Sequence, residues 1–451
     1  MNSINEKIPF LRVVPDGWKT RRLKEISKIN LSNVDKKSHD GEKVVKLCNY
    51  VDVYYNHTIS DKIDFMIATA SDEQIRKLTL KKDDVILTKD SESPSDIGIP
   101  TWVKEDMPGV VCGYHLALIR PNVNVVTGLY LYYLLYSYGF KEHFWISAKG
   151  VTRFGISKGD IQNIQLLIPP IELQNKITRY LKEKDLLIDK LIKKKENLIM
   201  LLQQQRQSII TEAVTKGLNS NVKMKDLGIE WIGGIPEHWN VKKLKYFIST
   251  VKGYAFKSEL FVEDGVRVVK TTDIKNGTTV NLSNTYIALE KSLEFGKVKV
   301  CKNDILMSTV GSAAHVVNSA VGQLGLVGEE FDGALLNQNA VKLVGKESIV
   351  INKYLFYFLN NKWYREYLNI GAHGTANQAS LSLNYILDFV SILPSLEEQR
   401  EIVDHIDSKL NQIATISVVI NKQIEKLKEY RQALIYEAVT GKIDVRDMKL
   451  D

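Results

Sequence analysis

The chain has 451 residues, too many for one hydrophobic core, and this length indicates two or more domains. Its composition, 44% hydrophobic and 25% charged, is that of a soluble globular protein. The net charge of +8 permits nucleic-acid binding without establishing it, because an ordinary basic protein has the same balance.

The cysteines and the apolar runs indicate where the protein works. Cys48, Cys112 and Cys301 lie far apart and form neither a CxxC pair nor a disulfide framework. The longest apolar run, near 129–138, is too short and too rich in Tyr to span a bilayer. With no secretory signal visible, we expect a cytoplasmic protein without a membrane partner.

The chain contains two globular parts that begin alike, with VPDGWKTRRLKEI at 14–26 and IPEHWNVKKLKYF at 235–247. Short strands follow in each part, then a Tyr-rich amphipathic helix, a polar loop and one more strand. The aromatic side chains of the Tyr-rich helices fit a hydrophobic core better than a base-stacking surface. The expected strands are 44–55, 83–88, 110–120 and 161–169, then 267–274, 298–308, 334–344 and 385–394; the helices are 129–144 and 353–368; the loops are 148–160 and 372–384.

Each globular part leads into a long helix, Pro169–Gly217 and Leu393–Lys442, and the two helices match without a gap at a spacing of 225 residues. Both end in EAVT. A period this long indicates one duplicated module rather than a solenoid. The predicted fold is therefore α+β, with two similar domains in a pseudo-two-fold arrangement. The predicted boundaries are 1–167 and 218–392 for the domains, 168–217 and 393–442 for the helices, and 443–451 for a tail.

The long helices carry a heptad pattern, which predicts a coiled coil. The expected seam on the first helix is Ile177, Leu181, Lys184, Ile188, Leu191, Lys195, Leu198, Leu202, Gln205 and Ile209, and the second helix repeats it at +225. A helix of about 45 residues is roughly 65 Å long. Antiparallel packing is expected, because a parallel pair would require the second domain to bridge that length.

Several apolar residues of the helices lie outside this predicted seam. One interpretation is that they fold beneath the flanking domains. The other, which we favour, is that they receive helices of a partner protein. The candidate partner-binding residues are Leu187, Ile192, Ile199, Ile210, Val419, Ile424 and Ile435.

The familiar catalytic motifs are missing from the sequence. We find no Walker A motif, HExxH, GxSxG, Cys/His metal cluster or Gly-rich cofactor loop. The pattern favours a non-enzymatic binding protein, although a coiled-coil scaffold without DNA readout and an enzyme with an unrecognised site stay open.

Several motifs occur twice in the same order, and with them the chain resembles, over essentially its whole length, the specificity subunit of type I restriction–modification systems. The first motif is Pro-x-x-Trp with a following Leu, at Pro15, Trp18 and Leu23 and again at Pro236, Trp239 and Leu244. Next come the Asp elements Asp84–Leu87 and Asp304–Leu306 and the segments Gly113–Pro121 and Asn337–Gly345. The last is the pair of long helices, each of which follows a proline and ends in EAVT. The two parts agree at these positions and diverge in their loops.

The resemblance implies two target-recognition domains, each reading one half of a split double-stranded DNA sequence. The helices would set the gap, at most roughly 65 Å or about 19 base pairs. They would also dock two methyltransferase subunits and, through them, the restriction and translocase subunits. The chain itself would hold no cofactor, since S-adenosylmethionine, ATP and Mg²⁺ would belong to those partners. An insertion of four residues near Val214 is expected to lengthen the gap.

Base readout requires polar or basic side chains on elements that face a groove, and phosphate contacts add affinity. We nominate polar loop residues on composition, with solvated loop residues as the alternative. In the first domain they are Thr88, Lys89, Lys149, Thr152 and Arg153; in the second they are Lys252, Lys257, Ser308, Thr309, His373, Thr375, Asn377 and Gln378.

Overall fold

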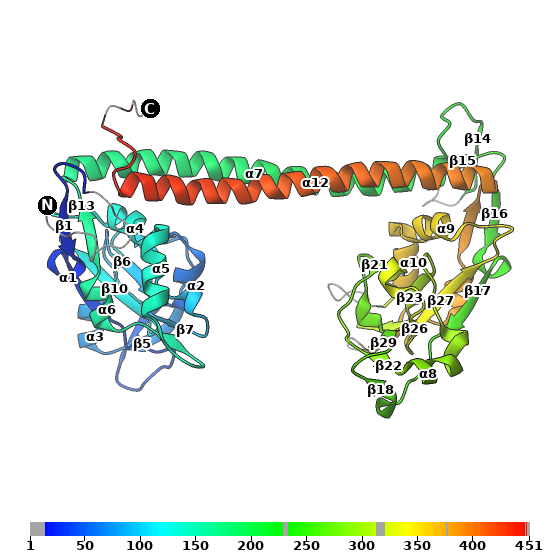
Figure 1. Cartoon of the computed structure of the whole chain (residues 1–451), viewed down its shortest axis with the longest axis horizontal. Helices are drawn as coiled ribbons and strands as arrows, with labels where there is room; N and C mark the ends of the chain where they lie inside the picture. The colour runs from blue at the N-terminus through cyan, green and yellow to red at the C-terminus, as the bar shows by residue number, and fades with distance from the viewer. Residues whose placement is uncertain (1–13, 229–232, 313–320, 376–377, 447, 449–451) are drawn as a thin grey trace. The chain divides into compact units, whose positions relative to one another are not determined.

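A computed structural model describes residues 14–228, 233–312, 321–375, 378–446 and 448 of the chain (Figure 1). It forms two compact units. Unit 1 comprises Met1–Glu196 and Asn421–Asp451, and unit 2 comprises Asn197–Ile420. Both unit boundaries fall inside long helices, so each unit contains one globular domain and part of both helices.

A five-stranded sheet forms the centre of unit 1. Its strands, in spatial order, are β2 (Ser27–Leu31), β10 (Leu116–Pro121), β6 (Val85–Thr88), β8 (Pro100–Val103) and β4 (Thr58–Ile59). The central strands are buried because their sequences are almost entirely apolar. A second sheet, β5 (Met66–Ala70), β3 (Lys43–Cys48) and β9 (Val110–Cys112), encloses a separate hydrophobic cluster.

Several elements of unit 1 differ from the predicted ones, and two of them change the fold most. The strand predicted over 44–55 ends at Cys48, because Asn49 caps a helix, α2 (Tyr50–Tyr55), through the Val51 N–H. The Tyr-rich helix is interrupted at Ser137 and forms α4 (Gly128–Tyr136) and α5 (Tyr138–Ser147). Most tyrosines of α4 are buried, which confirms that they belong to the core.

Unit 2 repeats the central sheet of unit 1. The spatial order is β17 (Ile248–Lys252), β27 (Ala340–Gly345), β23 (Ile305–Ser308), β25 (Leu324–Leu326), β21 (Gly277–Thr279) and β20 (Ile274–Lys275). Helices α9 (Asn352–Leu359) and α10 (Lys362–Gly371) take the places of α4 and α5. The α+β class and the duplication are therefore confirmed, whereas the pseudo-two-fold arrangement of the units stays a prediction.

The same two-stranded junction leads into each long helix. In unit 1, β1 (Lys19–Arg22) pairs with β13 (Gln165–Ile168) before α7 (Ile171–Lys216); in unit 2, β16 (Asn240–Lys243) pairs with β30 (Val390–Leu393) before α12 (Leu396–Val439). The Pro-x-x-Trp motif packs on the far end of a helix. A Cβ at Gly217, where φ is +73°, would lie 3.1 Å from the Trp239 ring; a Cβ at Gly441, where φ is +72°, would lie 3.2 Å from the Trp18 ring. Glycine is thus required after each EAVT segment.

Helices α7 and α12 are antiparallel within each unit. In unit 1 the start of α7 shares a core with the end of α12, and Lys195 donates a hydrogen bond to Gln423 at 2.6 Å. In unit 2 the end of α7 shares a core with the start of α12. Arg431 adds ion pairs with Asp185 and Asp189 in unit 1. The predicted orientation is confirmed in each unit.

The heptad seam is shifted on one of its two rows. The row of Leu181, Ile188 and Leu202 is buried as predicted, but Leu191 and Leu198 are 46% and 44% exposed. On the other row, the less exposed positions lie one residue later in the chain than predicted, and they include the half-buried Ile192 and Ile199. On α12, Ile416 and Tyr430 are exposed in the same way while Ile424 is buried. The prediction failed because apolar residues at adjacent positions fit either row.

Burial corrects three of the proposed partner-binding residues. Ile210 and Ile435 pack into the cores of the flanking domains, which was the alternative interpretation, and Ile424 is buried in the shifted seam. Ile192 and Ile199 are half-buried in the same seam. Of the original set, Leu187 and Val419 are exposed, at 51% and 48%.

Candidate nucleic-acid interface

The residues nominated in unit 1 converge on a small three-stranded sheet. It consists of β7 (Asp90–Ser91), β12 (Phe154–Gly155) and β11 (Lys149–Gly150), and it forms where a polar loop was expected. Gly150 has φ +148°, and a Cβ there would lie 1.9 Å from the Arg153 carbonyl oxygen, so only glycine permits this turn. Lys149, Thr152 and Arg153 are exposed around the tip, as the prediction requires.

A cluster of charged side chains covers this sheet. Asp90 Oδ1 accepts hydrogen bonds from Arg153 Nη2 at 3.0 Å and Nε at 3.3 Å. The same oxygen contacts His115 Nδ1, and Asp90 Oδ2 accepts from Lys89 Nζ at 2.7 Å. Lys89 Nζ also lies 4.7 Å from the centroid of the Tyr114 ring, within range of a cation–π interaction. One carboxylate therefore organises three basic side chains.

The protonation states follow from these surroundings. Burial raises the pKa of the Asp90 carboxyl, but hydrogen bonds and charges from Lys89 and His115 outweigh burial and hold it below its ordinary value. Burial lowers the pKa of His115; Asp90 opposes this shift, and Arg153 adds to it. At neutral pH the cluster therefore contains a carboxylate and a neutral imidazole.

Two nominated residues of unit 1 have other roles. Thr88 is fully buried; its hydroxyl donates to Asp96 O at 2.7 Å and accepts from Ile99 N–H at 2.9 Å. Lys89 is only 14% exposed at its side chain, because it is held between Asp90 and Tyr114. Neither side chain is presented for a direct DNA contact, which corrects both nominations.

Unit 2 carries an equivalent sheet, β24 (Val310–Gly311), β29 (Gln378–Ser380) and β28 (His373–Thr375). His373 is exposed, and Gly374 has φ +141°, close to the value at Gly150. Asn377 lies outside the described residues, and Thr375 and Gln378 are placed here by backbone only.

Beside this sheet, unit 2 has a polar hollow at the end of β17. It brings together Lys252, Thr309, Gln338 and Asn339 from three separate segments. Lys252 is exposed, and Thr309 is half-buried with its hydroxyl donating to Asn339 O at 3.0 Å. Lys257 is exposed outside the hollow. Ser308 is fully buried and donates to Val310 O at 2.9 Å, so it cannot reach DNA and that nomination is corrected.

Sequence reasoning nominated the Thr88–Ser93 loop without singling out Asp90, overlooked Tyr114, Gln338 and Asn339, and treated His115 as a structural residue. All five lie where the central sheet ends beside the hairpin sheet. Leu116 pairs with Thr88, and Ala340 pairs with Ser308, so the residues preceding Leu116 and Ala340 lie next to the nominated loops. Correct pairing of the predicted strands would have revealed them.

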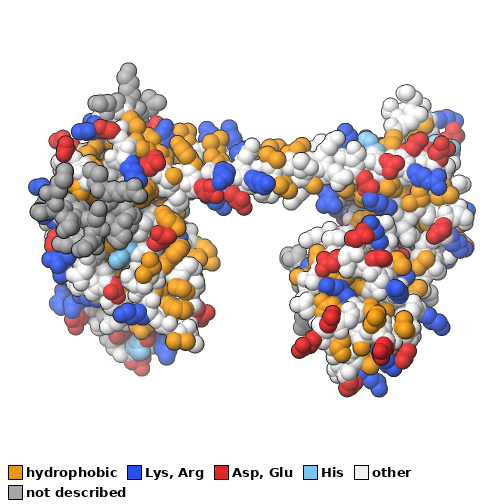
Figure 2. All heavy atoms as spheres, in the orientation of Figure 1, with side chains coloured by type: hydrophobic (Ala, Val, Ile, Leu, Met, Phe, Trp, Pro, Cys, Tyr) orange, Lys and Arg blue, Asp and Glu red, His pale blue; other side chains and the backbone are white. Residues whose placement is uncertain are grey.

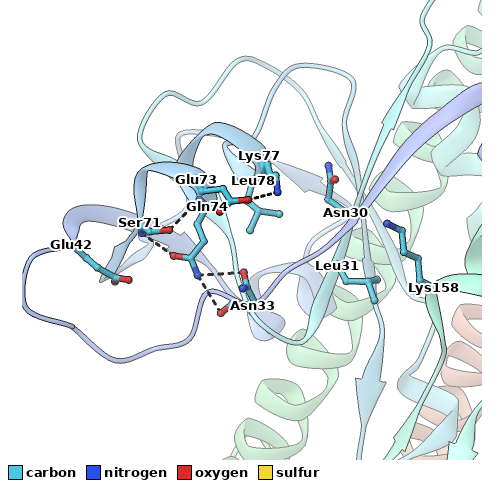
Figure 3. Close-up of a pocket in the computed structure, with 10 residues that line it drawn as sticks. All are labelled: Asn30, Leu31, Asn33, Glu42, Ser71, Glu73, Gln74, Lys77, Leu78 and Lys158. Carbon is cyan, nitrogen blue, oxygen red and sulfur yellow. Dashed lines mark hydrogen bonds and ion pairs between the residues drawn. The ribbon is translucent and has the colours of Figure 1, made fainter.

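Another hollow, this one in unit 1, lies between α3 (Asp72–Leu78), β2 and α6 (Lys158–Asn163) (Figure 3). Several of its polar groups bind one another. Gln74 caps its own helix through Ser71 N–H at 2.8 Å and also reaches Asn33 Oδ1 at 3.3 Å, while Lys77 pairs with Glu73. This hollow is better explained by helix capping than by ligand binding.

The described residues contain no group of three or more His, Cys, Asp or Glu side chains able to hold a metal ion. They also contain no helix long and apolar enough to cross a membrane.

Comparison with known proteins agrees with this architecture. The model of the type I restriction modification DNA specificity domain matches residues 15–201 and 236–426. The chain is 24% identical over 374 residues to the type I restriction enzyme MjaVIII specificity subunit of Methanocaldococcus jannaschii, which covers 83% of this chain and 82% of that protein. It is 26% identical over 447 residues to the putative MjaX specificity subunit of the same organism, with 96% and 95% covered.

A solved structure from a study of complex assembly and conformational transition in a type I R-M system has a similar fold. The TM-score is 0.68 at 16% identity, with 96% of this chain and 100% of that chain covered. Since the two family matches together span most of the sequence, the chain belongs to the type I restriction–modification DNA specificity family. With one copy of the domain beginning in each unit, it is a specificity subunit with two target-recognition domains.

Proposed function

We propose that each unit binds one half of a split double-stranded DNA target through its hairpin sheet, and that α7 and α12 fix the gap between the halves. The observation that carries this proposal is a repeated scaffold with different surfaces. Sheets β7–β12–β11 and β24–β29–β28 recur on the same core, but the side chains that cover them differ. Two different half-sites require this combination of shared positioning and separate readout.

The exposed residues supply the expected chemistry. In unit 1, Thr152 and Arg153 on the hairpin tip are proposed to reach base edges, and Lys149 a phosphate. In unit 2, Thr309 and His373 are proposed for base edges, and Lys252 and Lys257 for phosphates. Thr375, Asn377 and Gln378 stay candidates on sequence grounds alone.

The helix pair is proposed to dock one methyltransferase subunit in each unit. Exposed apolar residues lie at matching levels of the two helices, as the Lys195–Gln423 bond indicates. In an antiparallel helix pair, residues at the same heptad position beside the seam lie next to each other on the two helices. The patches are Leu187, Leu191 and Tyr430 in unit 1, and Leu198, Leu201, Ile416 and Val419 in unit 2. Hydrophobic side chains reach the surface along these helices in Figure 2.

Catalysis would then reside in the partners. The methyltransferase subunits would hold S-adenosylmethionine, and the restriction subunits would hold ATP and Mg²⁺. The chain would contribute sequence recognition and assembly, in agreement with the absence of known catalytic motifs from its sequence.

DNA recognition is tested by selection from a library of randomised duplexes with the full chain and its methyltransferase partner. We expect enrichment of two unlike half-sites separated by a fixed gap. No enrichment, with the complex intact, would favour a scaffold without DNA readout.

Docking is tested with the double variant Leu201→Glu/Val419→Glu. It should lower the methyltransferase recovered with each chain from two subunits to one, because two buried charges would replace apolar contact in unit 2 while the unit 1 patch stays intact. The matched control is Ile370→Glu, which alters a 77% exposed residue of α10 in the same unit. Equal loss in both variants would argue against the patch.

A further inference from the structure

Asp90 is an unexpected residue for a DNA-binding face. A carboxylate repels phosphates, so its presence beside Lys149 and Arg153 lowers the general affinity of unit 1 for DNA. Its side chain is only 17% exposed, and it accepts hydrogen bonds from two basic residues while contacting a third. Because Asp90 lowers the affinity for DNA, its presence indicates another role in the site.

The geometry identifies that role as bracing Arg153. The described contacts of Arg153 use Nε and Nη2, both directed at Asp90 Oδ1. They occupy one side of the guanidinium and leave Nη1 without a partner among the described residues. The side chain is 54% exposed, so its outer edge is open to solvent. Nη2 also contacts His115, so the part of the guanidinium left for a ligand is the Nη1 end, which carries two N–H groups.

His115 and Lys89 hold Asp90 in the position from which it binds Arg153. Both ring nitrogens of His115 lie close to Arg153 Nη2, at 2.9 and 3.0 Å, so the imidazole lies beside the guanidinium. Lys89 binds the second oxygen of Asp90 at 2.7 Å from its position over Tyr114. Asp90 therefore cannot rotate without breaking contacts on both of its oxygens.

Building on the proposed function, we propose that Arg153 reads a guanine of the first half-site, and that Asp90 and His115 are positioning residues that orient its guanidinium for this contact. Guanine presents two acceptors, O6 and N7, in the major groove, and an arginine guanidinium is the side chain that most often binds them. A braced arginine loses less conformational freedom on binding, and this favours a directional base contact. A phosphate contact requires only a flexible cation and would gain nothing from an adjacent carboxylate.

The test is selection from randomised duplexes with the full chain and its methyltransferase partner, for the wild type and for Arg153→Ala. We expect the wild type to enrich a guanine in the first half-site. Arg153→Ala should lose the preference at that position, by roughly tenfold or more, and keep the rest of the motif. Arg153→Lys should not restore it, because an ammonium lacks the planar fork.

Asp90→Asn separates positioning from charge. It should weaken the preference at the same guanine while affinity for unrelated DNA holds or rises. Combined with Arg153→Ala, it should cause no further loss at that position. The matched control is Glu92→Gln, which removes an exposed negative charge from the same loop and should leave the guanine preference intact.

The possible outcomes distinguish this inference from the proposed function. If Arg153→Ala weakens all duplexes equally and reduces the salt dependence by about one ion, Arg153 contacts a phosphate and the inference is wrong. If the wild type enriches a split motif that Arg153→Ala leaves unchanged, only the inference fails. If the intact wild-type complex enriches nothing, the proposed function and this inference fail together.

Discussion

The two hairpin sheets differ in charge although the scaffold beneath them is the same. Strand pairing places Lys89 and Asp90 of unit 1 at the positions of Thr309 and Val310 in unit 2. By the same pairing, Tyr114 and His115 correspond to Gln338 and Asn339. Unit 1 therefore presents a braced ionic cluster, and unit 2 presents neutral amides and hydroxyls. The difference shows that the side chains at this edge of the sheet can change while the positions of the strands stay fixed.

The buried parts of the units show the opposite behaviour. Gln174 and Gln399 are both fully buried and make the same three hydrogen bonds. Gln174 accepts from Thr127 N–H and donates to Val125 O and Pro169 O; Gln399 accepts from Ile351 N–H and donates to Ile349 O and Pro394 O. The glutamine of the helix-opening motif is thus a structural link between each domain and its helix.

The largest expected difference between the units concerns the ion pair that each forms on its central sheet. Asp84, fully buried, binds Arg120 through two hydrogen bonds of 2.8 and 2.6 Å, whereas Asp304 meets Lys342 through one contact of 3.1 Å. Asp84→Asn should destabilise unit 1 by about 3 kcal/mol, because Arg120 loses its counter-charge. Asp304→Asn should destabilise unit 2 by about 1 kcal/mol.

Hydrogen exchange of the two units under native conditions would measure both effects. Equal losses would mean that the second pair is as tightly coupled as the first, and the contrast between the units would not extend into their cores.

The next prediction tests the shared scaffold. Gln174→Ala and Gln399→Ala should each destabilise their own unit by about 2–3 kcal/mol, because three buried backbone groups lose their partner. Urea denaturation, followed by hydrogen exchange in each unit, would report the losses. Gln412→Ala, at an exposed position of α12, provides the control. A large loss in one unit alone would contradict the equivalence of the two domains.

The smallest expected effect is a pH dependence limited to unit 1. The pKa of His115 is below its ordinary value, so the imidazole is neutral at pH 7 and gains a proton only in more acidic solution. The added charge would repel Arg153 and Lys89 and compete for Asp90. Discrimination in the first half-site should therefore fall several-fold between about pH 7.5 and pH 5.5.

This pH series is best run in a His373→Gln background, which removes the exposed imidazole of the unit 2 hairpin. Binding to duplexes altered in one half-site at a time gives the discrimination for each unit. His115→Asn should abolish the pH dependence. A decline of the same size in both half-sites would show that the effect does not come from the unit 1 cluster.

The sequence predicted the duplicated domains and the long antiparallel helices well, because both depend on repeated apolar spacing. The predicted helix from Pro169 begins two residues later, at Ile171, and ends at Lys216. The seam was harder to predict. Leu191 and Leu198 are as apolar as Ile192 and Ile199, and only the packed pair shows which row is buried.

The candidate site was predictable only in part. Composition led to Arg153 and Lys149, but it also led to Thr88 and Ser308, whose hydroxyls satisfy backbone groups inside the fold. Asp90 gave no signal, since an acidic residue is not expected on a DNA-binding face. Its role depends on strand pairing between segments that are far apart in the sequence.

We propose that α7 and α12 set the spacing between the two DNA-reading units. Val214 lies in the core of unit 2, so an insertion near it would disturb the domain as well as the helix. A better variant adds one heptad to each helix, between Glu196 and Asn197 and between Lys422 and Gln423, near the level of the Lys195–Gln423 hydrogen bond. Seven residues lengthen a helix by about 10 Å, or about three base pairs of DNA.

Selection from randomised duplexes would compare this variant with the wild type, in complex with the methyltransferase partner. Both half-sites should be retained, and the gap between them should grow by about three base pairs. An unchanged gap, with both units still folded by hydrogen exchange, would contradict the claim that the helices set the spacing.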